Sequence, residues 1–192
     1  MTPRKITTKI ENIVASVVLD QKLDLEEIAA GMPEVQYAPE DFPGLVYRLK
    51  KPKTATLIFN TGNMVCTGAK SEKDVKKAVG KIVKSLNEAG YRMAGSPTIT
   101  IQNVVGCGSL GRSVDLERAV MTLKNSMYEP EQFPGLIYRM RDPKNVVLIF
   151  GSGKFVIVGA KSEKQVPEAA RILAGHLQEL DLMQNLEAEG DA

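Results

Sequence analysis

The sequence predicts an α+β protein built from two copies of one unit, and two observations predict it. An offset of 91 residues aligns Ile10 with Ile101 and keeps the register without a gap to about residue 178. Within each copy, the signals for strands and helices recur in the same order. A repeat this long, present in only two copies, favours a pseudo-two-fold pair of half-domains over a solenoid.

The matched segments also set the expected domain organisation. Three pairs of segments are the most alike: 37–48 with 128–139, 52–62 with 143–153, and 68–73 with 159–164. We therefore expect residues 1–95 to form the first half and residues 96–182 the second. Residues 183–192 end in Glu-Ala-Glu-Gly-Asp-Ala, a composition that predicts an acidic, disordered tail.

Local patterns predict each element of the first copy in order. Residues 10–19 are β-branched and apolar, which predicts a strand, and Asp24 then caps a short helix. Four short strands punctuated by Pro and Gly should follow, near residues 35–37, 45–50, 55–60 and 64–69. Ser71 caps a longer helix with apolar residues at i, i+3 and i+4, and Ser162 with Gln165 should cap its mate. Both copies together give about ten strands and four helices.

The strand patterns indicate that both faces of the sheet are apolar. Four helices cover about one face of a ten-stranded sheet. In the strand at 55–60, Thr56 and Ile58 share one face, whereas Leu57 and Phe59 share the other. The face without helices therefore presents large apolar side chains, which is typical of a binding surface. A sandwich between the two halves and a homodimer interface are alternatives that this pattern leaves open.

Composition argues against several classes of protein. The chain is 43% apolar and 25% charged, which fits a globular protein, and its net charge of +2 does not by itself imply a polyanionic partner. No apolar run reaches the ~18 residues of a membrane helix and no secretory signal opens the chain, so we expect a cytoplasmic protein without membrane contact. Cys66 and Cys107 favour reduced, structural thiols, and no metal or other cofactor is expected.

No group of residues favours catalysis. The segment 106–111 reads G-x-G-x-x-G, but the other copy makes the same turn without glycine and no parallel β-α-β pattern follows. The only histidine, His176, is expected on a helix surface. Glu129 and Glu131 lie in a Pro-bearing loop, which is more typical of a partner contact than of an acid/base pair. The sequence therefore does not predict an enzyme.

Four of the five phenylalanines are repeat-matched and lie beside turns. Phe42 and Phe133 each precede Pro-Gly, and Phe59 and Phe150 each end a Leu-Ile-Phe strand. A phenylalanine ordinarily belongs to the core. Matched pairs at strand ends are instead typical of apolar wedges that open base steps in the minor groove of DNA.

Polar side chains at matched positions support the same interpretation. Asn12 and Asn103 can donate to the hydrogen-bond acceptors of the minor groove. Matched basic residues suit contacts with phosphate oxygens, namely Arg48 with Arg139 and Lys70 with Lys161. Wedges, amides and cations together predict a protein that binds duplex DNA.

With these residues, the sequence resembles the TATA-box-binding protein family of general transcription initiation factors, in its archaeal form, from about residue 6 to 181. The combination of E-P-E-x-F-P-G-L-I-Y-R-M, P-K-x-x-x-L-I-F-x-S-G-K and G-A-K-S-E carries the resemblance. It implies a saddle whose one curved antiparallel sheet grips TATA-like DNA, with four helices on the convex face. It also implies a location in the cytoplasm beside the nucleoid, or in the nucleus of a eukaryote.

The resemblance implies a role for each matched position. The intercalating residues would be Phe42, Phe59, Phe133 and Phe150, and the central asparagines Asn12 and Asn103. The groove would be lined by Val14, Val105, Leu57, Leu148, Val65 and Val156. Phosphates would be contacted by Arg48, Arg139, Lys70, Lys161 and Lys154. The family's groove-floor threonine is kept as Thr67 but is replaced by Val158 in the second copy, and Asn63 replaces a lysine of the first copy.

The expected function is that of a non-catalytic general transcription factor that binds and bends TATA-like promoter DNA and nucleates the pre-initiation complex. In the family, transcription factor B docks on the second-copy loop, so Glu129 and Glu131 are its expected contacts and RNA polymerase is reached indirectly. A weak homodimer is expected in the absence of DNA. The alternative is an interaction scaffold whose apolar sheet binds a peptide or a second copy, but such a scaffold does not need matched Phe wedges beside matched Arg and Lys.

Overall fold

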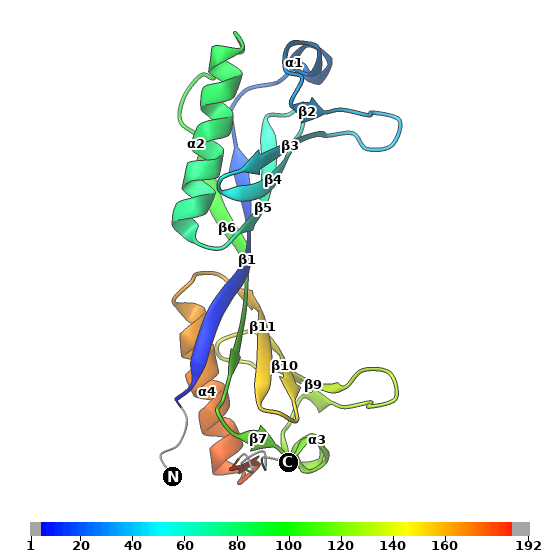
Figure 1. Cartoon of the computed structure of the whole chain (residues 1–192), viewed down its shortest axis with the longest axis vertical. Helices are drawn as coiled ribbons and strands as arrows, with labels where there is room; N and C mark the ends of the chain where they lie inside the picture. Colours follow the sequence, from blue (N-terminus) through cyan, green and yellow to red (C-terminus); the bar gives the residue numbers. More distant parts are fainter. Residues whose placement is uncertain (1–4, 186–192) are drawn as a thin grey trace, which may run out of the picture. The chain divides into compact units, whose positions relative to one another are not determined.

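The computed structural model describes residues 5–185, and the chain divides into two compact units (Figure 1). The first unit holds residues 11–103, and the second unit holds residues 5–10 together with residues 104–185 of the described chain. Strands β1 (Thr7–Val18) and β6 (Thr98–Ser109) each contribute residues to both units. The boundary expected at residues 95/96 lies between a helix and β6, outside any element, and stays a prediction for the repeats.

The first unit contains the elements that the sequence predicts for the first copy. After β1 it comprises α1 (Leu25–Gly31), β2 (Val35–Gln36), β3 (Leu45–Lys50), β4 (Lys53–Ile58), β5 (Asn63–Ala69) and α2 (Glu72–Glu88). Asp24 accepts a hydrogen bond from the Glu27 N–H, and Ser71 accepts one from the Asp74 N–H. Both side chains are therefore N-caps, as expected.

The second unit repeats this order and adds a small ladder. Its elements after β6 are β7 (Ser113–Val114), α3 (Leu116–Thr122), β8 (Ser126–Met127), β9 (Gly135–Arg139), β10 (Val146–Phe150), β11 (Lys154–Ala160), α4 (Gln165–Glu179) and β12 (Met183–Gln184). β12 pairs with β7 through Met183 and Val114. The tail expected from residue 183 therefore does not begin there, and residues 186–192 lie outside the described part of the chain.

The cap of α4 differs from the expectation. The helix begins after Lys164 rather than after Ser162, and Lys164 makes no capping hydrogen bond through its side chain. Ser162 and Gln165 still cooperate, because the Gln165 N–H donates to Ser162 Oγ at 3.3 Å and Gln165 Oε1 accepts the Lys161 N–H at 2.6 Å. The two side chains thus satisfy backbone groups just before the first turn.

The strands form one hydrogen-bonded order, β2-β3-β4-β5-β1-β6-β11-β10-β9-β8. Within each unit every pair with an assigned register is antiparallel. In the described chain this gives a ten-stranded sheet and four helices, which confirms the predicted α+β class with two repeats.

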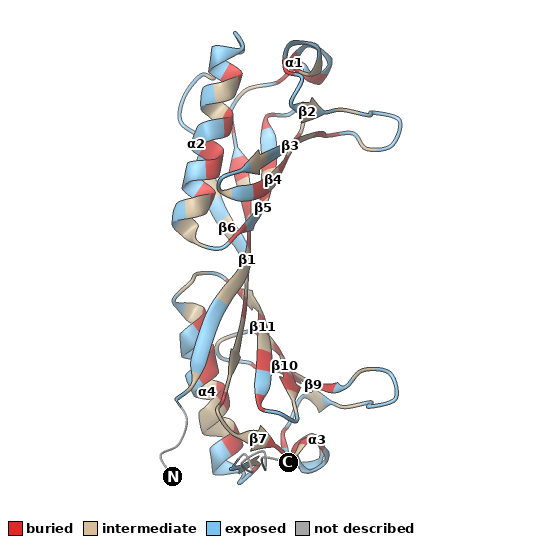
Figure 2. Ribbon diagram, viewed as in Figure 1, coloured by how far each residue is buried: buried red, intermediate tan, exposed pale blue. Residues whose placement is uncertain are grey.

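In each unit the long helix covers one face of its strands and buries the core. α2 packs against β5, and α4 packs against β11 (Figure 1). Burial alternates along the strands, so that Ile13, Ala15 and Val17 are buried whereas Val14 and Ser16 are half-buried. Figure 2 shows the buried residues of both long helices as a stripe along one side. The opposite strand face keeps half-exposed apolar residues, as the strand patterns predict.

The glycine-rich segment 106–111 is explained by packing. A Cβ on Gly108 would lie 2.5 Å from the Phe155 ring and would also meet the Thr7 carbonyl oxygen. The aligned residue of the first copy is Val17, and Met64 stands there in place of Phe155. A larger neighbour therefore fills the space of the absent side chain. The segment has a structural role, as the comparison of the two copies indicates.

Titratable groups behind the sheet are also structural. His176 is half-buried rather than on an open helix surface, because its Nδ1 lies 3.0 Å from the Tyr138 hydroxyl and the two rings meet edge to face. Burial raises the pKa of the Tyr138 phenol, which keeps it neutral. Burial also raises the pKa of the Cys66 thiol, as expected for an unreactive core cysteine.

Candidate nucleic-acid interface

The open face of the first unit carries two rows of side chains that run across its strands. The strand registers place four residues in one line, which we call the leucine row: Val46, Leu57, Val65 and Ser16. A second line, the arginine row, consists of Arg48, Ala55 and Thr67. Arg48 is exposed at the end of its row, and the other six residues are half-buried. The face is therefore mainly apolar, with a cation at one edge.

The second unit has the same two rows in the same register. Its leucine row is Ile137, Leu148, Val156 and Cys107, and its arginine row is Arg139, Val146 and Val158. Arg139 is again the exposed residue. The groove-lining and arginine positions named from the sequence thus gather on one face within each unit. The other two, Val14 and Val105, are half-buried in β1 and β6.

Each unit also holds a pair of phenylalanine rings beside its rows. The ring centroids of Phe42 and Phe59 lie 5.9 Å apart at 63°, and those of Phe133 and Phe150 lie 5.9 Å apart at 65°. Edge-to-face contact at this distance is the favoured geometry of aromatic pairs. All four rings are half-buried. The structure therefore brings together the loop phenylalanine and the strand-end phenylalanine that the sequence predicts as wedges.

A glycine beneath each pair makes this arrangement possible. A Cβ on Gly135 would lie 2.7 Å from the Phe133 ring and 3.1 Å from the Phe150 ring. The corresponding distances at Gly44 are 2.6 Å and 3.0 Å, to Phe42 and Phe59. The sequence analysis places these glycines only in turns. The Phe-Pro-Gly triplet, which occurs at matched positions in both copies, is the signal that could have predicted their role beneath the rings.

The asparagine of the first unit is held in place by its neighbours. Asn12 Oδ1 accepts the Gly68 N–H at 2.8 Å, and Asn12 Nδ2 donates to Thr67 Oγ1 at 3.4 Å. The amide therefore has a fixed position beside the arginine row. In the second unit Val158 stands at the position of Thr67 and offers no hydroxyl group.

Basic side chains lie around the rows. Lys70, Lys154 and Lys161 are exposed, as are both arginines. Lys70 Nζ lies 3.5 Å from Glu11 Oε2, and their side chains are 59% and 35% exposed. Such a solvated ion pair is weak, because water and salt screen it. Glu11 was not identified from the sequence, since its proximity to Lys70 depends on the β1–β5 register.

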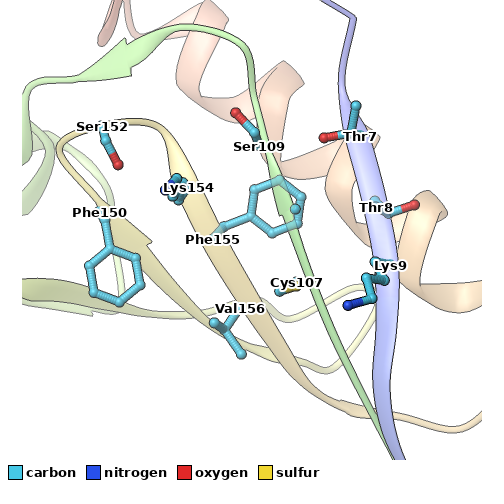
Figure 3. Close-up of a pocket in the computed structure, with 11 residues that line it drawn as sticks. Thr7, Thr8, Lys9, Cys107, Ser109, Phe150, Ser152, Lys154, Phe155 and Val156 are labelled. Carbon is cyan, nitrogen blue, oxygen red and sulfur yellow. The ribbon is translucent and has the colours of Figure 1, made fainter. Parts of the chain in front are cut away.

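A hollow of about 630 Å3 lies on the second unit beside its wedge. Figure 3 shows Val156 and Cys107 between Phe150 on one side and Lys9 of β1 on the other. Lys154 also lines the hollow. Cys107 is therefore half-exposed in the candidate interface, whereas Cys66 is fully buried. The sequence analysis predicts the same structural role for both cysteines.

The carboxylates of the second loop are exposed on a turn whose backbone is the same in both copies. Phe133 N–H donates to the Glu129 carbonyl oxygen at 2.9 Å, and Phe42 N–H donates to that of Ala38 at 2.9 Å. Glu129 and Glu131 make no side-chain hydrogen bond or ion pair within residues 5–185. Each loop carries two acids, Glu40 and Asp41 in the first and Glu129 and Glu131 in the second, so the loops differ in the positions of their charges rather than in shape.

The described residues contain no group of three or more His, Cys, Asp or Glu side chains that could hold a metal ion. None of the helices within residues 5–185 is long and apolar enough to cross a membrane.

Comparison with known proteins identifies the family. Residues 7–89 and 98–180 each match the family described as transcription factor TFIID, or TATA-binding protein. The chain is 54% identical to the TATA-box-binding protein of Pyrobaculum calidifontis, over 95% of this chain and 92% of that protein. It is 56% identical to that of Pyrodictium occultum, over 92% and 88%. The solved structure of Methanococcus jannaschii TBP superposes with a TM-score of 0.83 at 46% identity, covering 90% of this chain and 98% of that one.

These relatives come from archaea, and the description of the matched family is that of a transcription factor rather than an enzyme, as the sequence predicts. Both matched segments coincide with the two repeats, and each contains one leucine row, one arginine row and one phenylalanine pair. The chain therefore belongs to the TATA-binding protein family.

Proposed function

We propose that this protein binds and bends TATA-like promoter DNA through the minor groove and so nucleates a transcription pre-initiation complex. The observation that carries the proposal is an apolar strand face bordered by a half-buried pair of phenylalanines and an exposed arginine, present once in each unit. An A·T minor groove lacks the 2-amino group of guanine, so an apolar face can lie close against its floor while Asn12 and Asn103 donate to its acceptors. Apolar wedges open that groove by unstacking base steps, a mechanism of which this protein family is itself an example.

In this proposal, each set of side chains on the open faces makes a different kind of contact with DNA. The leucine row provides contact area along the groove floor, and Asn12 and Asn103 donate to adenine N3 and thymine O2. Arg48, Arg139 and the exposed lysines contact phosphates, which fixes the register of the protein on the duplex without reading sequence. The phenylalanine pairs enter base steps at the two ends of the site and bend the DNA.

The proposed protein partners would bind the loop that holds Glu129 and Glu131 and the apolar strand face. Glu129 and Glu131 would receive basic side chains of transcription factor B, which in turn would recruit RNA polymerase. Without DNA, the apolar face is expected to hold two copies together weakly. The protein would act where its promoter DNA lies, beside the nucleoid in the cytoplasm.

A gel shift tests this proposal directly. An A·T-rich duplex and a G·C-rich duplex of equal length are compared at two salt concentrations, and a circular-permutation series of the A·T-rich site reports bending. We expect tighter binding to the A·T-rich duplex and a clear bend. Equal affinity for the two duplexes, or binding without a bend, would contradict the proposal.

Neutralising one arginine should weaken binding to all sequences about equally. Arg48→Gln or Arg139→Gln removes a phosphate contact, so the slope of log Kd against log salt should fall by about 1 unit. The measurement is a salt titration by fluorescence anisotropy. Lys73→Gln, on the exposed side of α2, is the control and should leave the slope unchanged. An unchanged slope in the arginine variants would remove them from the interface.

Removing the acid beside Lys70 should strengthen binding. Glu11→Gln frees Lys70 from an ion pair and removes a negative charge near the phosphates, so we expect affinity to rise about threefold at low salt and less at high salt. The matched control is Gln102→Glu, which places an acid at the aligned position of the second copy and should weaken binding. If Glu11→Gln binds more weakly than the parent, Lys70 is not a phosphate contact.

A further inference from the structure

The open faces of the two units differ in a consistent direction. Both leucine rows have the same central Leu and Val, and both arginine rows have the same Arg. The other four positions all differ, with the first-unit residue given first: Val46 and Ile137, Ser16 and Cys107, Ala55 and Val146, Thr67 and Val158. Two of these pairs replace a hydroxyl group, and two replace a smaller aliphatic side chain with a larger one. The first face is therefore both more polar and roomier.

The hydroxyl groups of the first face are accessible and ordered. Ser16 Oγ accepts a hydrogen bond from Gln102 Nε2 at 2.8 Å, and Thr67 Oγ1 accepts one from Asn12 Nδ2 at 3.4 Å. A hydroxyl oxygen has two lone pairs, so each can accept a second hydrogen bond. On the second face Cys107 lines the hollow with Val156, and neither its thiol nor the Val158 side chain is a good acceptor (Figure 3).

The difference in polarity and size between the two faces should affect how each face accommodates one chemical group of DNA. In the minor groove an A·T pair presents only acceptors, whereas guanine adds a 2-amino group that donates a hydrogen bond. On the first face the hydroxyls of Ser16 and Thr67 can accept that bond, and Val46 and Ala55 leave room for the group. On the second face the same amino group would be buried without an acceptor, which is costly.

We propose that the first-unit face tolerates a purine 2-amino group in the minor groove and that the second-unit face rejects it. The protein would then choose its direction on DNA by placing its second unit over the half-site that lacks such a group. This inference rests on the proposed function, since it concerns the same face and the same ligand. It assigns this preference for one direction to Ser16, Thr67, Cys107 and Val158.

The test reads direction from DNA cleavage. A palindromic all-A·T site is compared with one in which 2,6-diaminopurine replaces one adenine of one half, a change that adds only the 2-amino group. An iron–EDTA reagent is attached to Gln132→Cys in a Cys107→Val background, because Cys66 is fully buried and Val keeps this position free of hydroxyl. We expect equal cleavage at both ends of the palindrome, and about tenfold more at the end away from diaminopurine in the modified site.

Two further variants should change the cleavage pattern in opposite, defined ways: one reverses it and one abolishes the preference. Attaching the reagent to Asp41→Cys, the aligned residue of the first loop, should reverse the cleaved end. Thr67→Val combined with Ser16→Ala should bring the cleavage ratio on the modified site close to one, and the melting temperature of the free variant shows whether it is folded. Equal cleavage of the modified site by the parent, or an unchanged ratio in the double variant, would overturn this inference. Failure of the parent to bind the unmodified palindrome would instead contradict the proposed function.

Discussion

Phe150→Ala is expected to reduce strongly the bend of a bound A·T-rich duplex while the free protein stays folded. The ring is half-buried and contacts Phe133 at the surface, so its loss opens no core cavity. Without this wedge one base step remains stacked, and the duplex is not kinked there. Phe59→Ala should do the same through the first unit. Circular permutation measures the bend, and calorimetry of the free protein measures its melting temperature.

The fifth phenylalanine provides the matched control. Phe155 is 1% exposed and fills the space beside Gly108, so Phe155→Ala should destabilise the fold by about 3–5 kcal/mol. Phe150→Ala should therefore lose DNA bending but not stability, whereas Phe155→Ala should lose stability. Should Phe150→Ala unfold the protein and leave the bend unchanged, the ring belongs to the core and the wedge assignment is wrong.

Reversing the charge of the second loop is expected to abolish the complex with transcription factor B and to leave DNA binding intact. In Glu129→Arg combined with Glu131→Arg, two exposed acids become cations that repel a basic partner. The added positive charge should strengthen binary DNA binding slightly. A gel shift with and without transcription factor B separates the two effects.

The first loop supplies the control for this experiment. Ala38→Arg combined with Glu40→Arg changes the aligned positions on a turn of the same backbone. This variant should still form the complex with transcription factor B. Normal assembly by the second-loop variant, or equal loss from both loops, would show that the factor does not dock on Glu129 and Glu131.

Most of the fold could be predicted because its signals are local and occur twice. Alternation along a strand is enough to place Leu57 and Phe59 on the face opposite Ile58. The β7–β12 ladder could not be predicted, since it joins Val114 to Met183 through only two residues on each side. Such a short ladder has no periodicity.

The candidate site divides in the same way. The wedges and cations were found because they stand at matched positions in the two copies. Glu11 was missed because its contact with Lys70 joins residues 59 apart and depends on strand register. Cys107 was missed because local sequence does not distinguish the open face from the core when both are apolar.

The division of β1 between the two units bears on how such a chain could arise. Residues 7–10 belong to the second unit, where a side chain on Gly108 would strike the Thr7 carbonyl, whereas residues 13–18 pair with β5 of the first. A polypeptide with a single repeat would therefore lack part of its own sheet. Two such polypeptides could complete each other by exchanging the ends of their first strands, as domain-swapped dimers do. Gene duplication and fusion would then convert an exchanged homodimer into a single chain, after which each half was free to acquire its own loop charges and groove contacts.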